Sequence, residues 1–364
     1  MLEGLKRWFQ RYFSDEEALS LLLVLVTGLL VVVFFGGVLA PVLTAIVIAY
    51  LMQGLVNNLM RHGLSHRLSV MVVFMLFVTA LVAVLVLMLP LLWKQSVMLV
   101  RDQLPGLVAR AEDWFLTLPN RYPEMISPDQ VERIVSALRQ DLTHAGQSLL
   151  SLSLSSIPGL LDVMIFLVLL PLLVFFFLKD KDTLMNWLVS WLPSRRGALN
   201  WVWKEMDQQI ANYVRGKALE VLLVGGASYL AFILLGLNYA LLLGLLVGLS
   251  VIVPYIGATV VTIPVAAVAW IQFGWGSEFA LIMVVYGVIQ FIDGNILVPL
   301  LFSEAVNLHP VAIITAILFF GGLWGLWGVF FAIPLATLIK AVLAVWPTSG
   351  PRVSEGAPDQ PAAG

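Results

Sequence analysis

The sequence predicts an all-α polytopic membrane protein with about eight transmembrane segments, some of them broken, and a small helical insertion on the outer side. Of its 364 residues, 60% are apolar and only 12% are charged, whereas soluble domains carry roughly 25% charged residues. The mean hydropathy is +0.97. Polar surface is therefore too scarce to cover a water-soluble globule, which argues against a soluble enzyme. The net charge of −2 and the abundance of large apolar residues are the reverse of a disordered composition.

The first half of the chain holds four runs that are long and apolar enough to cross a bilayer. A hydrocarbon core of about 30 Å needs about 20 helical residues, so charge-free runs can be read as membrane spans. The predicted spans are Leu19 to Phe35, Val38 to Val56, Leu68 to Trp93 and Ile157 to Leu178. Pro41 falls in the first turn of the second span, where a missing N–H costs least.

The second half supplies four further segments. The 57 residues from Val221 to Ser277 contain no charge, and Gly236 and Asn238 divide this run into a fifth and a sixth segment. Phe279 to Leu301 forms a seventh segment, which Asp293 interrupts. Ala305 to Ile339 is a charge-free run of 35 residues and is too long for one straight span. We therefore expect the sixth and eighth segments to be broken.

Two polar regions lie between the predicted spans. Residues 94–156 contain two amphipathic helices, whose apolar stripes must pack on each other, on a second subunit or on a partner protein. Residues 179–217 combine basic side chains with four tryptophans, a composition typical of a helix lying along the inner leaflet. With eight crossings, all lysines and arginines outside 94–156 fall on one side, which predicts that both termini are cytoplasmic.

Acidic residues without basic neighbours mark the second half. Between Lys217 and Lys340 there are 122 residues with no Lys or Arg. An acid at membrane depth costs at least ~2.5 kcal/mol and is a functional hypothesis by default. Asp293 is the deepest candidate, and the alternative is an acid at the water boundary that caps a break at Gly294. Glu220 is a secondary candidate, for which an interfacial ion pair with Lys217 is the simpler interpretation.

Helix-breaking residues occur within the same apolar runs. Unwound backbone survives at membrane depth only where protein buries it or where it lines a wet cavity, and secondary transporters bind substrates at such breaks. Alternatively, glycines let helices pack closely, which is the better interpretation for Gly321 to Gly328. The candidate site residues of this kind are Pro254, Tyr255, Gly257, Asn295 and Pro299, with Pro334 and His309 as secondary candidates.

Several of these motifs together resemble the autoinducer-2 exporter (AI-2E) family. The resemblance spans about residues 15–347, and one branch, the inner-membrane permeases of Gram-negative bacteria, matches closely. It is carried by Gln209, Tyr213 and Gly216, by Val253–Gly257, by Asp293–Pro299, by Asn307–Pro310 and by Pro334–Ala336. The resemblance implies an eight-segment transporter in the bacterial inner membrane that exports small molecules or, in some relatives, exchanges sodium for protons.

The predicted organisation has six parts, and residues 94–156 would be periplasmic. The parts are 1–93 (amino-terminal cytoplasmic segment and spans one to three), 94–156 (amphipathic helices), 157–178 (span four), 179–217 (interfacial helices), 218–346 (spans five to eight, the transport core) and 347–364 (disordered cytoplasmic tail).

The leading hypothesis is a secondary transporter that moves a small polar solute outward, with Asp293 coupling this movement to a proton or sodium gradient. The alternatives are a membrane scaffold that docks an envelope protein through residues 94–156, a Na⁺/H⁺ antiporter, and a homo-oligomeric form of any of these.

An enzyme, a metal site and a cofactor are not expected. The chain has no cysteine, which excludes disulfides and thiolate metal sites. No Walker-type glycine-rich loop is present, so ATP is not the direct energy source. A zinc protease would need a His-Glu-x-x-His helix, which is absent, and His62 and His66 lie in a short loop without an acidic ligand. The near-neutral charge offers no basic surface for nucleic acid.

Overall fold

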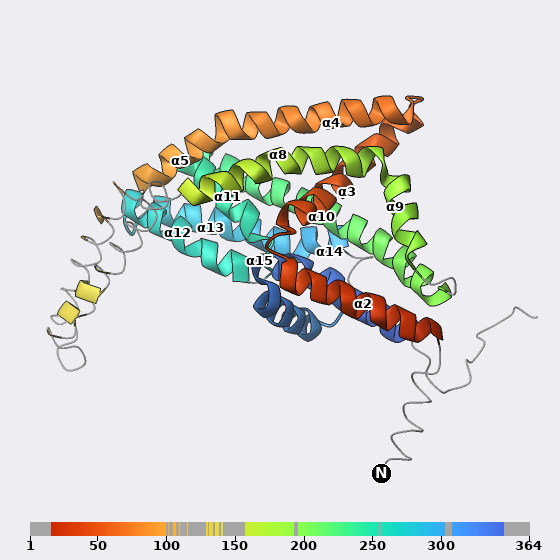
Figure 1. Cartoon of the computed structure of the whole chain (residues 1–364). Coiled ribbons are helices and arrows are strands. Elements are labelled where there is room, and N and C mark those ends of the chain that lie inside the picture. The colour runs from red at the N-terminus through yellow and green to blue at the C-terminus, as the bar shows by residue number, and fades with distance from the viewer. Residues whose placement is uncertain are drawn as a thin grey trace, which may run out of the picture.

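The computed structural model describes residues 16–99, 157–192, 196–254, 256–302 and 308–345, with scattered positions between 101 and 140. These ranges contain helices and no strand, as Figure 1 shows, which confirms the predicted all-α fold. Most of the predicted polar region 94–156 and the whole tail 347–364 lie outside the described residues.

The first half forms a bundle in which α3 packs against α4 and α8 (Figure 1). Its elements are α2 (Glu16–Phe35), α3 (Ala40–Arg61), α4 (His66–Ala83), the π-helix η1 (Val84–Met88), α5 (Leu89–Met98) and α8 (Ile157–Lys179). Ala45 and Ala49 are buried where α3 meets α8, because small side chains let two helices approach closely. The outer face of α4 instead exposes large apolar side chains such as Met71 and Met75, as a lipid-facing helix does.

A single long helix, α10 (Gly197–Leu234), organises the second half. It contacts α2, α3, α11, α13, α14 and α15. Its 38 residues span about 57 Å at 1.5 Å per residue. The predicted boundary between interfacial helices and the fifth span, at residue 217, therefore falls inside one continuous helix. Ahead of it, α9 (Lys181–Ser190) bends by 83° from α8 after Lys179.

The predicted sixth segment is a helical hairpin rather than a single crossing. Helix α11 (Ala240–Ser250) runs away from the end of α10, and α12 (Ile256–Phe273) returns to it. Gln272 fixes this return, because its amide donates to Gly236 O at 2.7 Å and accepts from Asn238 N at 2.8 Å. The 11 residues of α11 cover only about 16 Å, short of a 30 Å core.

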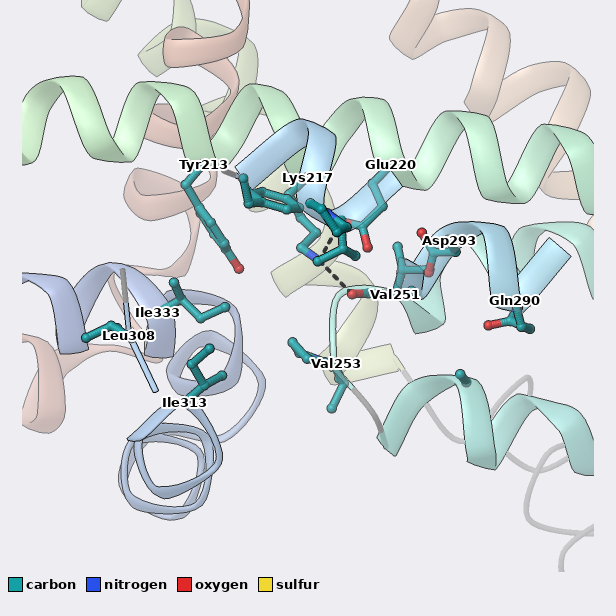
Figure 2. Close-up of a pocket in the computed structure, with 16 residues that line it drawn as sticks. Tyr213, Lys217, Glu220, Val251, Val253, Gln290, Asp293, Leu308, Ile313 and Ile333 are labelled. Carbon is teal, nitrogen blue, oxygen red and sulfur yellow. Dashed lines mark hydrogen bonds and ion pairs between the residues drawn. The ribbon is translucent and has the colours of Figure 1, made fainter. Parts of the chain in front are cut away.

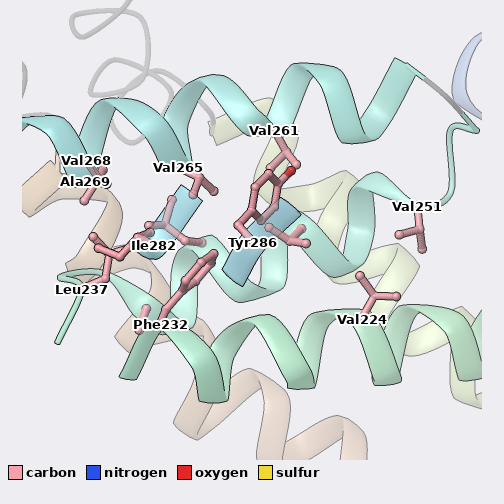
Figure 3. Packing of buried hydrophobic residues seen from close by; sticks show 13 residues of the cluster. Val224, Phe232, Leu237, Val251, Val261, Val265, Val268, Ala269, Ile282 and Tyr286 are labelled. Atoms are coloured by element: carbon pink, nitrogen blue, oxygen red, sulfur yellow. The ribbon is translucent and has the colours of Figure 1, made fainter. Parts of the chain in front are cut away.

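The hairpin packs tightly on α10 through apolar side chains and glycines. Figure 3 shows the shared core of α10, α11, α12 and α13. Gly244 lies against Tyr229 and Gly248 lies against Val221, with no space for a Cβ at either glycine. Phe232 is fully buried in this core. The tip of the hairpin is thereby held beside the middle of α10.

The seventh segment stays helical where a break was predicted. It comprises α13 (Ser277–Ile292), the π-helical turn η3 (Asp293–Leu297) and α14 (Val298–Phe302). Gly294 and Asn295 lie in the π-helical turn, which widens the helix locally without unwinding it. The prediction of an unwound backbone at this position is therefore wrong.

The eighth segment, α15 (Pro310–Val345), is broken as predicted. Gly325 adopts φ 59° and ψ −138°, a conformation essentially restricted to glycine, and the chain reverses there. Phe320 on the first limb packs with Ala332 on the second. Gly321 and Gly328 sit where the limbs touch and leave no room for a Cβ, which agrees with the close-packing interpretation of these glycines.

By length and composition, six helices in the described part of the chain can cross a membrane, or seven if the bent pair α8 and α9 is one span. Helices α2 and α11 are also apolar but are shorter than these spans. The predicted segments thus all correspond to apolar helices. The two that are missing from the six full-length spans are α2, which is shorter, and α8, which passes only together with α9.

Candidate functional site

A cavity of about 390 Å³ lies where α10 meets the tip of the α11–α12 hairpin, the π-helical turn η3 and the base of the α15 hairpin (Figure 2). Its volume falls in the range of small-molecule sites, roughly 300–1,000 Å³. Three charged side chains line it, Lys217, Glu220 and Asp293, and the rest of the wall is mostly apolar. The polar groups of this cavity thus stand out against a hydrophobic background.

One face of α10 supplies three of the cavity side chains. Tyr213, Lys217 and Glu220 are spaced four and three residues apart, which places them on the same side of a helix. All three are buried. Lys217 and Glu220 lie near the middle of α10, where its charged first half ends and its charge-free second half begins at Val221.

Lys217 is fully engaged by the surrounding protein. Its Nζ lies 2.7 Å from Glu220 Oε2, and it donates a hydrogen bond of 2.9 Å to Val251 O. It also stands over the ring of Phe302, 5.1 Å from the centroid. The ammonium therefore has an anion, a carbonyl oxygen and the face of an aromatic ring around it. Only 4% of Lys217 is exposed, so water does not compete for it.

The hairpin tip owes its position to the local sequence. Val251 follows the last residue of α11, and Pro254 has no N–H with which to continue a helix. Gly257 begins the return close to Ser250 O, where no Cβ fits. The free carbonyl at Val251, left by the end of α11, is the one that Lys217 binds.

Asp293 enters the cavity from the first residue of η3. It is 8% exposed, and its Oδ1 has no hydrogen-bond partner in the described protein. Figure 2 shows it beside Glu220, and the charges of both acids interact with that of Lys217. One turn earlier, the buried Nε2 of Gln290 is also without a partner. Unmet polar groups of this kind call for a water, an ion or a ligand.

The α15 hairpin closes the opposite side. Tyr213 donates from its hydroxyl to Phe330 O at 2.8 Å, which joins α10 to the second limb of α15. Gly216 allows α14 to approach α10, because a Cβ there would lie 2.9 Å from the ring of Phe302. Ile313 and Ile333 form the apolar wall on this side.

Four of the candidate site residues from the sequence come together here. Asp293, Glu220, Pro254 and Pro299 all line the cavity. The alternative interpretation of Asp293, as an acid facing bulk water, does not fit its burial. The ion pair of Glu220 with Lys217 forms as predicted, and both side chains are buried in the protein.

Other candidates lie elsewhere. Asn295 is exposed, and its amide donates to Phe291 O at 2.9 Å, one turn back along the helix. His309 is exposed at the start of α15, where its Nδ1 accepts from Val311 N. Pro334 is buried within the second limb of α15. Tyr255 lies outside the described residues.

Gln290 and Val251 were not singled out by sequence reasoning, and Lys217 was named only as the ion-pair partner of Glu220. Lys217 is the last basic residue before the long charge-free stretch, which favours a boundary position on sequence grounds. Its spacing from Tyr213 and Glu220 on one helical face was the signal available. Among the described residues, no group of three or more His, Cys, Asp or Glu is arranged to hold a metal ion.

Comparison with known proteins identifies the family. The model of the AI-2E family transporter matches residues 21–348. A protein of Escherichia coli strain K12 named "Putative permease PerM" is 51% identical over 347 residues, which cover 95% of this chain and 98% of that protein. The Bacillus subtilis strain 168 protein named "Putative transport protein YueF" is 30% identical over 231 residues, 63% of this chain and 60% of that protein. These names indicate transport rather than catalysis, and the chain belongs to the AI-2E transporter family.

Proposed function

We propose that this protein is a secondary transporter of the bacterial inner membrane that carries a small polar solute through the cavity beside α10. The observation that carries the proposal is the convergence of three buried charged residues, Lys217, Glu220 and Asp293, on one cavity between helices that are long and apolar enough to cross a membrane. Burying charges there costs several kcal/mol per ion, and a purely structural bundle gains nothing from that arrangement. Both termini would be cytoplasmic.

The broken helices support movement as well as binding. The cavity is bounded by the tips and bases of two helical hairpins, whose ends are held by a few hydrogen bonds rather than by continuous helix. Secondary transporters use discontinuous helices of this kind around their binding sites. In this proposal the hairpins rearrange against α10 and open the cavity to each side in turn.

Asp293 is the coupling residue in this proposal. Oδ1 of Asp293 and Oε2 of Glu220 both lack a well-aligned hydrogen bond in the described protein, but Glu220 Oε2 lies 2.7 Å from the ammonium of Lys217. A proton or cation bound at Asp293 in one access state and released in the other would link solute movement to an ion gradient. No observation on the described residues favours the scaffold hypothesis over transport, since most of residues 94–156 lie outside them.

The test is accessibility of the cavity from the two faces of the membrane. The natural chain has no cysteine, so Val253→Cys introduces a single thiol at the cavity wall. A membrane-impermeant maleimide is added to one side or the other of sealed vesicles. Alternating access predicts labelling from each side, whereas the lipid-facing control Val284→Cys, at a position 61% exposed on the bundle surface, stays unlabelled.

Labelling of Val253→Cys from neither side would contradict the proposal. Labelling from one side alone would also contradict it and would favour a receptor or docking role. His62→Cys, in the exposed loop after α3, is the positive control for a thiol in water on a single side.

A further inference from the structure

The charged side chains of the cavity carry an excess of negative charge. Its three charged groups comprise two carboxylates and one ammonium, so the ionised set carries one excess negative charge. Glu220 and Lys217 neutralise each other at 2.7 Å. The excess charge therefore rests on Asp293.

The contacts of Lys217 and Asp293 with the surrounding protein lead to the same conclusion. Lys217 is paired with Glu220, donates to Val251 O and stands over the ring of Phe302, so its charge is already balanced inside the protein. Asp293 Oδ1, in a side chain only 8% exposed, has no partner in the described protein. The cavity therefore offers a ligand a hydrogen-bond acceptor at Asp293, whereas its one cation is already paired.

The rest of the cavity wall indicates the size and polarity of the ligand. Val253, Pro254, Val298, Pro299 and Ile313 present apolar surface to the cavity. A hard divalent cation such as calcium takes about six to eight oxygen ligands, whereas most of this wall is apolar. A volume of about 390 Å³ has room for an organic body beside a charged head.

Resting on the proposed transport function, we propose that the solute is a small amphiphilic organic cation, whose ammonium group binds Asp293 and whose apolar body lies on the hydrophobic wall. The unpartnered Nε2 of Gln290, one turn from Asp293, can donate to a hydroxyl or carbonyl oxygen of the same molecule. Neutral molecules of the same shape bind more weakly, and anions are rejected.

The experiment compares three molecules of similar shape and different charge. Phenethylammonium, 2-phenylethanol and phenylacetate are each tested for protection of Val253→Cys against the maleimide in vesicles. The thermal stability of the purified full-length chain is measured in parallel, because a ligand that binds the native state raises it. Phenethylammonium is expected to protect at a concentration at least about tenfold lower than 2-phenylethanol, as a charged hydrogen bond requires.

Two variants identify the group responsible. Asp293→Asn should abolish the preference for the ammonium. Glu278→Gln, which removes an exposed acid bonded to Ser277 outside the cavity, should leave it unchanged. Protection of the thiol and thermal stability are measured for both variants. Ligand binding can therefore be compared even if a variant no longer transports.

Equal effects of the three molecules, a stronger effect of phenylacetate, or no effect of the ammonium at millimolar concentration would each overturn the cation assignment. Sodium chloride alone reproducing the stabilisation would overturn it as well, in favour of an inorganic ion. These failures differ from failure of the transport proposal, in which Val253→Cys does not react from either side even without a ligand.

Discussion

Replacing Lys217 with methionine tests how far the buried charges depend on one another. The substitution keeps an unbranched side chain but removes the ion pair with Glu220, 2.7 Å long, between groups only 5% and 2% exposed. It also leaves Val251 O without its donor. Removal of one partner from a buried pair costs about 3–5 kcal/mol, because the other charge stays behind without compensation. We expect about 3 kcal/mol here, because the remaining carboxylates can relieve part of the penalty by taking up protons.

The double variant separates this effect from a simple loss of packing. Lys217→Met with Glu220→Gln removes the stranded charge, so it should be more stable than Lys217→Met alone and lack mainly the bond to Val251 O, about 1 kcal/mol. Unfolding by denaturant in detergent micelles, followed by tryptophan fluorescence, measures both. Lys204→Met, an exposed lysine on the same helix, is the control and should lie within about 0.5 kcal/mol of the wild type. The reasoning is refuted if Lys217→Met behaves like Lys204→Met, or if the two cavity substitutions simply add.

Three further substitutions test the hairpins. Gly257→Ala would place a methyl group against Ser250 O and should destabilise the protein by about 2 kcal/mol or more. The control Gly287→Ala has open space around it and should be tolerated. Equal melting temperatures of the two variants would contradict the close approach at the hairpin tip. Tyr213→Phe keeps the ring but loses the bond to α15, and should cost about 0.5–1.5 kcal/mol in the same unfolding assay. Gln272→Leu removes both hydrogen bonds at the hairpin base and should accelerate amide hydrogen exchange in α11; unchanged exchange would show that these bonds do not hold the hairpin closed.

The fold class and the positions of the apolar helices could be predicted because they depend on local composition. A charge-free run must be buried in lipid or protein wherever it lies in the fold. The reversal of the sixth segment could not be predicted in this way. Proline at 254 indicates a break, but the direction of the chain after it depends on Gln272 meeting Gly236 and Asn238, more than 30 residues away.

The candidate site was predicted in part for the same reason. Asp293 and Glu220 stand out as acids in apolar sequence, and both line the cavity. Lys217 looks like a boundary residue, because its burial follows from packing of α14 and the hairpin tip on α10, which no local pattern encodes. Asn295 was predicted as part of a helix break, but the chain stays helical there as a π-helical turn, and the amide of Asn295 bonds Phe291 O.

The most direct measurement of the central claim is ion movement driven by solute in proteoliposomes. The purified chain is reconstituted with a pH-sensitive or a sodium-sensitive dye inside the vesicles, and a low-molecular-mass extract of bacterial cells supplies the solutes. The account predicts that the extract causes proton or sodium movement with the wild type and with Glu278→Gln, and that Asp293→Asn loses it. Ion movement by Asp293→Asn at the wild-type rate, with the same dependence on the gradient, would contradict the account.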